Sequence, residues 1–99
     1  MLRHVVTWNY GEGFSEAENK ENALIIKRGL ESLTDCISGI IEIKVYINEL
    51  STSNRDLILN SLFESEVVLA EYQNYPEHKK VGEFISSVLQ NRTCIDYYE

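Results

Sequence analysis

The chain has 99 residues, with 16 acidic against 9 basic side chains and a formal net charge of −7. This length fits a single domain over residues 1–99 with one modest core. The acidic surplus excludes nucleic acids and anionic membranes as partners, because both bind basic surfaces and the chain has no basic run. No stretch is long and apolar enough for a signal peptide or a spanning helix, so a cytoplasmic location is expected.

The two cysteines, Cys36 and Cys94, lie far apart in the sequence and form no CxxC pair. Together with two distant histidines they do not match the spacing of metal ligands, so neither a metal nor another cofactor is expected. Without a secretion signal, both cysteines are interpreted as reduced, half-buried small side chains.

The first half of the chain predicts a strand, a helix and a second strand. Residues 2–9 are rich in β-branched and aromatic side chains, which is typical of a strand. Ser15 and Glu18 have the spacing of a capping box at the start of a helix that ends at Ser38-Gly39. Its apolar stripe is spaced by three and four residues: Ala23, Ile26, Leu30, Leu33 and Ile37. Residues 40–47 alternate, which predicts one buried strand face: Ile41, Ile43, Val45 and Ile47.

The second half predicts a strand, two helices and a last strand. Residues 56–63 are apolar on both faces, so both faces of this strand are expected to be covered. Ser65 begins a short helix, and Pro76 ends it and begins another. Residues 93–98 form the last strand.

This order, β-α-β-β-α-β, is the ferredoxin-like arrangement of the α+β class. Right-handed crossovers place the helices on one face of a four-stranded antiparallel sheet, which leaves the other face bare. Because the strand over residues 56–63 offers apolar side chains to both sides, a second copy packing sheet against sheet is the simplest cover. The sequence therefore predicts a homodimer through the sheet faces.

Four polar side chains are expected to share one interior. Tyr72 and His78 lie on the apolar stripes of the two predicted helices. Alternation places His4 on the same strand face as Val6 and Trp8, and Asp96 on one face of the last strand. If these faces turn toward the helices, they form an apolar pocket with few polar groups, as small-molecule sites usually are. The predicted ligand pocket consists of His4, Val6, Trp8, Val68, Val81, Ile85 and Asp96.

The chemistry of this set points to proton transfer. A neutral imidazole takes a proton α to a carbonyl, and a phenol donates to the enolate oxygen that results. A carboxylate such as Asp96 orients an imidazole. Each residue also has a structural interpretation: a core aromatic for Tyr72, a hydrogen-bonded core residue for His4, a turn cap for His78 and a solvated carboxylate for Asp96.

Several segments of the chain match one known family: Arg3-His4-Val5-Val6-Thr7-Trp8, Gly39-Ile40, Asp56-Leu57, Phe63-Glu64-Ser65, Tyr72-Gln73-Asn74-Tyr75-Pro76-Glu77-His78-Lys79-Lys80-Val81, Phe84 and Asp96-Tyr97. From end to end the chain resembles the stress-responsive A/B barrel family, the dimeric α+β barrel proteins. This resemblance implies a ferredoxin-like protomer whose sheet joins its partner's to form a β-barrel dimer.

Most members of this family have no assigned reaction. One plant branch, which the motifs resemble, comprises polyketide cyclases acting on linear tetraketide thioesters. The resemblance places the roles of its Tyr and His on Tyr72 and His78, with His4 lining the same pocket. Three functions therefore remain open: binding of a small apolar or aromatic carbonyl ligand between sheet and helices, a polyketide-cyclase-like or cofactor-independent monooxygenase-like enzyme, and a purely structural, stress-protective dimer.

Overall fold

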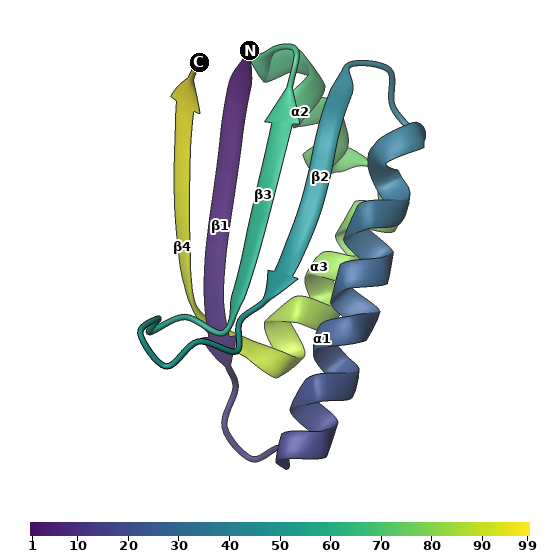
Figure 1. Ribbon diagram of the computed structural model, residues 1–99. Helices are drawn as coiled ribbons and strands as arrows, with labels where there is room; N and C mark the ends of the chain where they lie inside the picture. Colours follow the sequence, from purple (N-terminus) through teal and green to yellow (C-terminus); the bar gives the residue numbers. More distant parts are fainter.

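A computed structural model describes residues 1–99, which form one four-stranded antiparallel sheet with helices on one of its faces (Figure 1). The order of strands across the sheet is β2-β3-β1-β4. The elements along the chain are β1 (Leu2–Tyr10), α1 (Glu16–Glu31), a 3₁₀ turn (Ser32–Asp35), β2 (Ile40–Ile47), β3 (Leu57–Phe63), α2 (Glu66–Asn74), α3 (Pro76–Val88) and β4 (Leu89–Tyr98). The predicted ferredoxin-like α+β fold is confirmed.

Polar side chains and one proline explain where the helices begin. At the start of α1, Ser15 Oγ accepts from the Glu18 amide while the Glu18 carboxylate accepts from the Ser15 amide, which is the predicted capping box. At the start of α2, Ser65 Oγ accepts from the Val68 amide. Pro76 is the first residue of α3, where its missing N–H leaves no hydrogen bond unmade.

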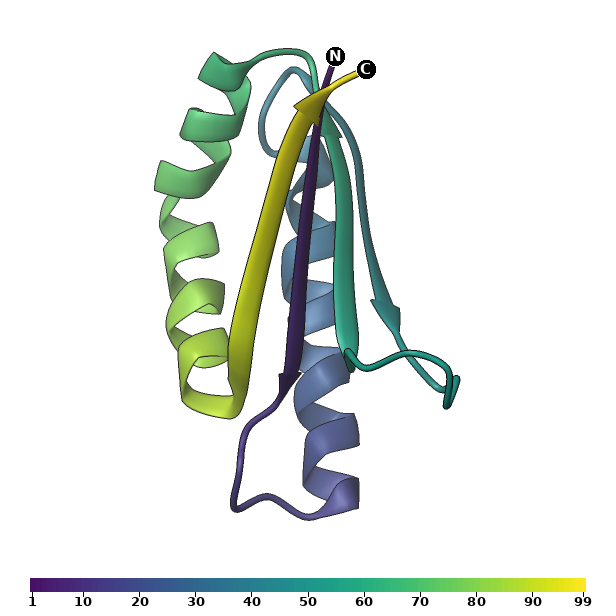
Figure 2. The same ribbon diagram turned by 90° about the vertical axis from the view of Figure 1, so that its left-hand side faces the viewer.

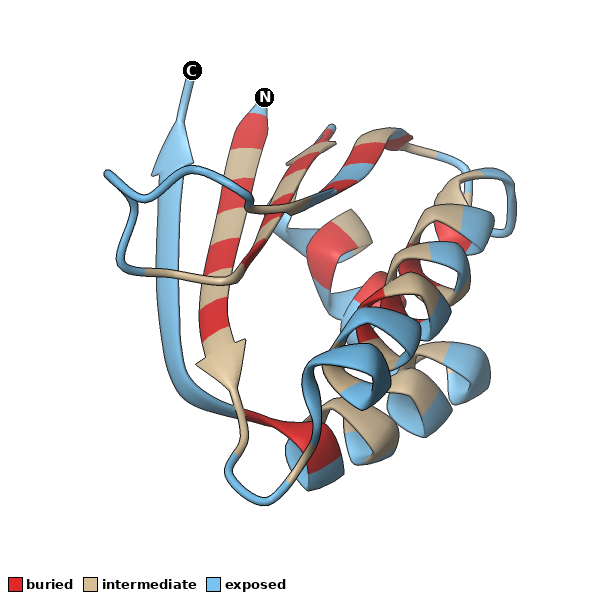
Figure 3. Cartoon of the chain, turned by 60° about the horizontal axis from the view of Figure 1, so that its bottom comes forward, coloured by how far each residue is buried: buried red, intermediate tan, exposed pale blue.

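The core lies between the helices and the sheet face that they cover (Figure 2). Residues of β1 and β3 alternate between buried and half-buried positions, as Figure 3 shows by colour. Gly29 of α1 allows α3 to approach closely, since a Cβ at this position would lie 2.9 Å from Val81 Cγ2. This contact positions α3 over the sheet.

The opposite sheet face carries no helix (Figure 2). Its polar side chains are tied together by Arg3, which donates hydrogen bonds to Glu99 and lies 3.5 Å from a Glu42 oxygen. The register places Ile95 of β4 opposite Val5 of β1 on this face, and Ile95 is 55% exposed. The uncovered face therefore offers apolar side chains to a partner.

Three details of the sequence interpretation are wrong. The helix expected to end at Ser38-Gly39 ends at Glu31 and is followed by the 3₁₀ turn. Ile41, expected on the buried face of β2, is exposed. The β2–β3 register shifts between Ile40 and Glu42, so the irregularity gives the buried position to Ile40. Cys36 and Cys94 are free and exposed instead of half-buried.

The first and last strands of the chain are neighbours in the sheet. The Glu99 amide donates to the Met1 carbonyl at 3.0 Å, so residues 1 and 99 lie side by side (Figure 1). None of the helices combines the length and the apolar character needed to cross a membrane.

Candidate functional site

A hollow of about 190 Å³, here called the inner hollow, lies between the sheet and the helices. Six elements, β1, β3, β4, α1, α2 and α3, contribute residues to its lining: His4, Val6, Trp8, Leu30, Leu59, Gln73, His78, Gly82, Ile85, Ser86 and Arg92. A cavity of about 150 Å³ is known to hold benzene, so the inner hollow has room for one substituted aromatic ring. Apolar side chains and a few polar groups meet there, as in most small-molecule sites.

His4 is held in the lining of the inner hollow by Asp96. The β1–β4 register sets the two residues opposite each other, and His4 Nδ1 lies 2.5 Å from Asp96 Oδ1. His4 is 3% exposed, whereas Asp96 is open to solvent. Since an ionised carboxylate only accepts, Nδ1 carries the proton and Nε2 is the nitrogen left for a ligand.

Tyr72 and His78 meet where α2 passes into α3. Their ring centroids are 4.4 Å apart with an edge-on geometry, and Phe63 packs on the other side of Tyr72 at 5.1 Å. Tyr72 is fully buried and its hydroxyl has no hydrogen-bond partner. Burial raises the pKa of the Tyr72 phenol, so the phenol remains protonated and able to donate.

The environment of His78 favours the neutral imidazole. Burial is the main cause that lowers the pKa of His78, and the nearby charges of His4 and Arg92 lower it further. An interaction with the Gln73 backbone acts in the opposite direction. A neutral imidazole that lines a hollow is able to accept a proton.

The structure brings part of the predicted site together. Of the predicted residues, five line the inner hollow: His4, Val6, Trp8, His78 and Ile85. Asp96 and Tyr72 are not among its lining residues, but each contacts a histidine that is: Asp96 contacts His4, and Tyr72 contacts His78. Two predicted residues pack elsewhere, since Val68 lies beside Gly39 and Val81 against Gly29.

Four polar or small lining residues were missed by sequence reasoning: Gln73, Gly82, Ser86 and Arg92. Gly82 and Ser86 follow His78 by four and eight positions, so helical spacing places all three on one face of α3. A Cβ on Gly82 would meet no atom within 4 Å, which shows that this glycine leaves space free. Arg92 has the same strand parity as Asp96, and extending the alternation of β4 would have found it.

The only group of side chains suited to a metal ion adjoins this site. His4, Cys94 and Asp96 offer nitrogen, sulfur and oxygen atoms that all lie within 4.8 Å of one another. The positive charge of the Arg92 guanidinium favours the thiolate of Cys94, so Arg92 lies near this group. A cation bound there would be repelled by that charge. His4 Nδ1 would also have to give up its bond to Asp96. The donor set therefore fits a hydrogen-bonded pair better than a metal ion.

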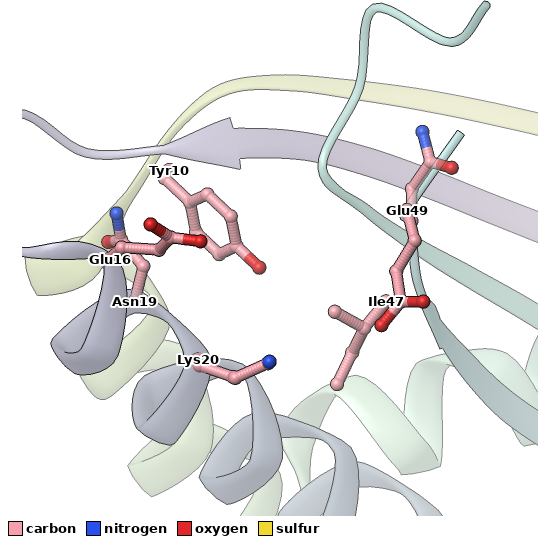
Figure 4. Close-up of a pocket in the computed structure, with 7 residues that line it drawn as sticks. Tyr10, Glu16, Asn19, Lys20, Ile47 and Glu49 are labelled. Carbon is pink, nitrogen blue, oxygen red and sulfur yellow. The ribbon is translucent and has the colours of Figure 1, made fainter. Parts of the chain in front are cut away.

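A larger hollow of about 540 Å³, the outer hollow, lies between the first turns of α1 and the end of β2. Figure 4 shows Lys20 on one side of it and Ile47 with Glu49 on the other. Only two of its seven lining residues are hydrophobic, and it contains no histidine or cysteine. The outer hollow is larger but lacks the largely apolar lining of a small-molecule site. The inner hollow is therefore the better candidate for a functional site.

Known proteins that resemble the chain share its fold. A family model described as stress responsive A/B barrel domain matches residues 2–99. No curated protein matches the chain.

Three solved structures illustrate the structural likeness. A Bacteroides fragilis protein, described as dimeric, ferredoxin-like and of unknown function, has 24% identity over 99% of this chain and 95% of its own, with a TM-score of 0.91. A dimeric ferredoxin-like protein from Thermobifida fusca has 16% identity over 99% and 90%, with a TM-score of 0.82. A putative antibiotic biosynthesis monooxygenase from Nitrosomonas europaea has 8% identity over 100% and 98%, with a TM-score of 0.79. At these identities the likeness shows the fold.

Proposed function

The chain belongs to the stress responsive A/B barrel domain family, and from this premise we propose that it binds a small apolar or aromatic carbonyl ligand in the inner hollow. The observation that carries this proposal is the convergence of two histidines, His4 and His78, with five hydrophobic residues on one space of about 190 Å³. Apolar side chains favour the body of a ligand, while the imidazoles offer hydrogen bonds to its oxygen atoms.

Binding is tested with acetophenone, a neutral aromatic ketone of suitable size. Trp8 is the only tryptophan of the chain and lines the inner hollow, so its fluorescence reports occupancy. We expect acetophenone to quench Trp8 in the wild type. In Gly82→Leu, which fills the free space beside Gly82, the quenching is lost.

Ser87→Leu is the matched control, because Ser87 lies on α3 but is exposed and outside the lining. It retains wild-type quenching. If acetophenone leaves the fluorescence of the wild type unchanged, or if both leucine variants behave alike, the binding proposal is wrong and the structural, stress-protective dimer remains.

A second candidate function is an enzyme that resembles a polyketide cyclase or a cofactor-independent monooxygenase, with His78 as general base and Tyr72 as oxyanion donor. It is favoured by the unpartnered hydroxyl of Tyr72 beside a neutral His78. His78 takes a proton from the carbon α to the ligand carbonyl, and the electron pair moves to the carbonyl oxygen. Tyr72 is not a lining residue and its hydroxyl is buried, so its role as donor requires a movement that opens the phenol to the inner hollow.

Exchange of the acetophenone methyl protons for deuterium in D₂O measures this step without a known substrate. We expect the wild type to catalyse the exchange. His78→Ala abolishes it, and Tyr72→Phe slows it by roughly 10²-fold or more, as loss of an oxyanion donor does in other enzymes. Binding of acetophenone without any exchange would support the ligand-binding function and contradict the enzymatic one.

The assembly we propose is a homodimer through the bare sheet faces, in the cytoplasm. Dimeric descriptions of the structural neighbours from Bacteroides fragilis and Thermobifida fusca support it. The exposed apolar side chains of the uncovered face, such as Ile95 and Tyr97, supply the surface that such contact would bury.

A further inference from the structure

Arg92 is the only lysine or arginine in the lining of the inner hollow, and no carboxylate is paired with it. It lines the hollow, yet it forms neither a salt bridge nor a hydrogen bond to an acidic group. Arg3, in contrast, is bonded to Glu99 and lies beside Glu42. Arg92 is an exposed residue, so its guanidinium is solvated when no ligand is bound.

An irregularity in β4 places Arg92 there. The β1–β4 register shifts between Thr7 and Asn9, so two residues of β4 lie opposite Trp8. Asn91 absorbs the shift with a positive φ of 57°, a conformation that asparagine tolerates better than most residues. Arg92 consequently joins Trp8 in the lining of the inner hollow.

Arg92 also links the inner hollow to the space next to it. A hollow of about 260 Å³, the adjoining hollow, shares four lining residues with the inner one: Trp8, Ile85, Ser86 and Arg92. Arg92 therefore borders both spaces, together with Trp8, Ile85 and Ser86.

We propose that the inner hollow takes a ligand with a carboxylate end, which Arg92 binds where the inner and adjoining hollows meet. This inference rests on the proposed function, because it specifies the class of ligand for the same hollow. The flat fork of a guanidinium matches the two oxygens of a carboxylate. The volume of about 190 Å³ suits a small planar aromatic or keto acid.

Benzoate and benzamide form a matched pair of probes, since they share ring and shape and differ in charge. Titration followed by Trp8 fluorescence gives both affinities. We expect the wild type to bind benzoate about tenfold or more tightly than benzamide, as hydrogen bonds between charged groups are stronger than neutral ones. Arg92→Gln removes this preference and leaves benzamide binding within about twofold of the wild type. Arg92→Lys retains part of it, because the charge remains while the fork is lost.

The control is Arg28→Gln, which makes the same change of net charge at an exposed residue of α1 outside the lining. It retains the preference for benzoate. The carboxylate inference is overturned if benzoate binds no more tightly than benzamide, if benzoate does not bind at millimolar concentration, or if Arg28→Gln weakens it as much as Arg92→Gln. When acetophenone still quenches Trp8 in any of these cases, the proposed function stands and the carboxylate inference alone has failed.

Discussion

The Nδ1–H of His4 and the carboxylate of Asp96 form a hydrogen bond between residues 92 positions apart in the sequence. The bond crosses from β1 to β4 within one register pair, so the first and last strands jointly orient the imidazole. One partner is buried and the other is open to solvent. Solvent therefore reaches the carboxylate while the imidazole remains in the lining of the inner hollow.

Replacing Asp96 by alanine is expected to change the tautomer of His4. Without the carboxylate, nothing holds the proton on Nδ1, and the Nε2–H form becomes more populated. The lost bond also lowers the free energy of unfolding by about 1–2 kcal/mol. Long-range ¹H–¹⁵N spectra of the histidine rings and urea unfolding measure both effects. Asp35→Ala, at an exposed residue of the 3₁₀ turn, leaves the His4 signals unchanged; identical spectra for Asp96→Ala and the wild type would contradict the prediction.

Tyr72→Phe is expected to leave the fold at least as stable as before. The substitution removes a buried hydroxyl that has no partner, so no hydrogen bond is lost and a desolvation cost disappears. Tyr72→Ala, which empties the space beside Phe63, costs about 3–5 kcal/mol. Urea unfolding of the two variants provides the comparison. A loss of more than about 1 kcal/mol in Tyr72→Phe would show that the hydroxyl has a partner in solution.

The pH dependence of stability should carry a contribution from His78. Its pKa in the folded protein lies below the ordinary value of 6.5, chiefly because of burial. As pH falls through 6.5, the unfolded chain takes up a proton that folded His78 does not, so stability is complete above 6.5 and declines from there toward the lowered pKa. His78→Gln removes this decline in urea unfolding measured at a series of pH values.

Arg92 contributes to the same shift through its charge. In Arg92→Gln the pKa of His78 is expected to rise toward 6.5 without reaching it, since burial, the larger cause, remains. NMR titration of the His78 Cε1–H resonance gives the midpoint directly. A midpoint of 6.5 or above in the wild type is the result that sinks both predictions.

The two helical glycines near the site should respond oppositely to alanine. Gly82→Ala is expected to stabilise the protein by about 0.5–1 kcal/mol, because alanine favours helix and its Cβ meets no atom within 4 Å. Gly29→Ala is expected to destabilise it, because its Cβ would lie 2.9 Å from Val81 Cγ2 and the branched valine adjusts poorly. Thermal unfolding tests both variants. Adding Val81→Ala to Gly29→Ala should restore part of the loss, and strictly additive effects would exclude the contact as its cause.

Ile95→Asp tests the uncovered sheet face. A charge at this 55% exposed apolar position opposite Val5 is expected to shift the sedimentation of the protein toward the monomer. Leu50→Asp, at a 72% exposed apolar residue of the loop between β2 and β3, is the control and leaves the oligomer unchanged. Equal sedimentation of the two variants would place the dimer interface elsewhere.

Local patterns were sufficient to predict the order of elements. The capping box at Ser15 and Glu18, the proline at the start of α3 and the alternation of β1 act over a few residues, and each appears in the structure as expected. The position of Ile41 was mispredicted because the register between β2 and β3 shifts there, which gives the buried position to Ile40 while Ile43 and Val45 stay buried. Such a shift depends on the partner strand, which the pattern of one segment does not contain.

The candidate site also contains some features that local patterns predict and others that depend on distant parts of the chain. Periodicity suggested that His4, His78 and Ile85 face one interior, and they line one hollow. The pairing of Asp96 with His4 depends on a register across 92 positions, which no local pattern specifies. Arg92 enters the lining through an irregularity at Asn91. The free space lies beside Gly82, which has no side chain. Volume left empty carries no sequence signature of its own.

The adjacency of residues 1 and 99 bears on how the fold closes. The pairing of β1 with β4 joins residues up to 96 positions apart, and closure of such a long loop is slow relative to local contacts. A circular permutant that joins Glu99 to Met1 through a short turn and opens the chain at the polar turn near Ser53 would convert this pair into a local hairpin. His4, Arg92 and Asp96 would then lie within one hairpin of consecutive residues, and the lining that depends most on distant sequence would become the part that assembles first.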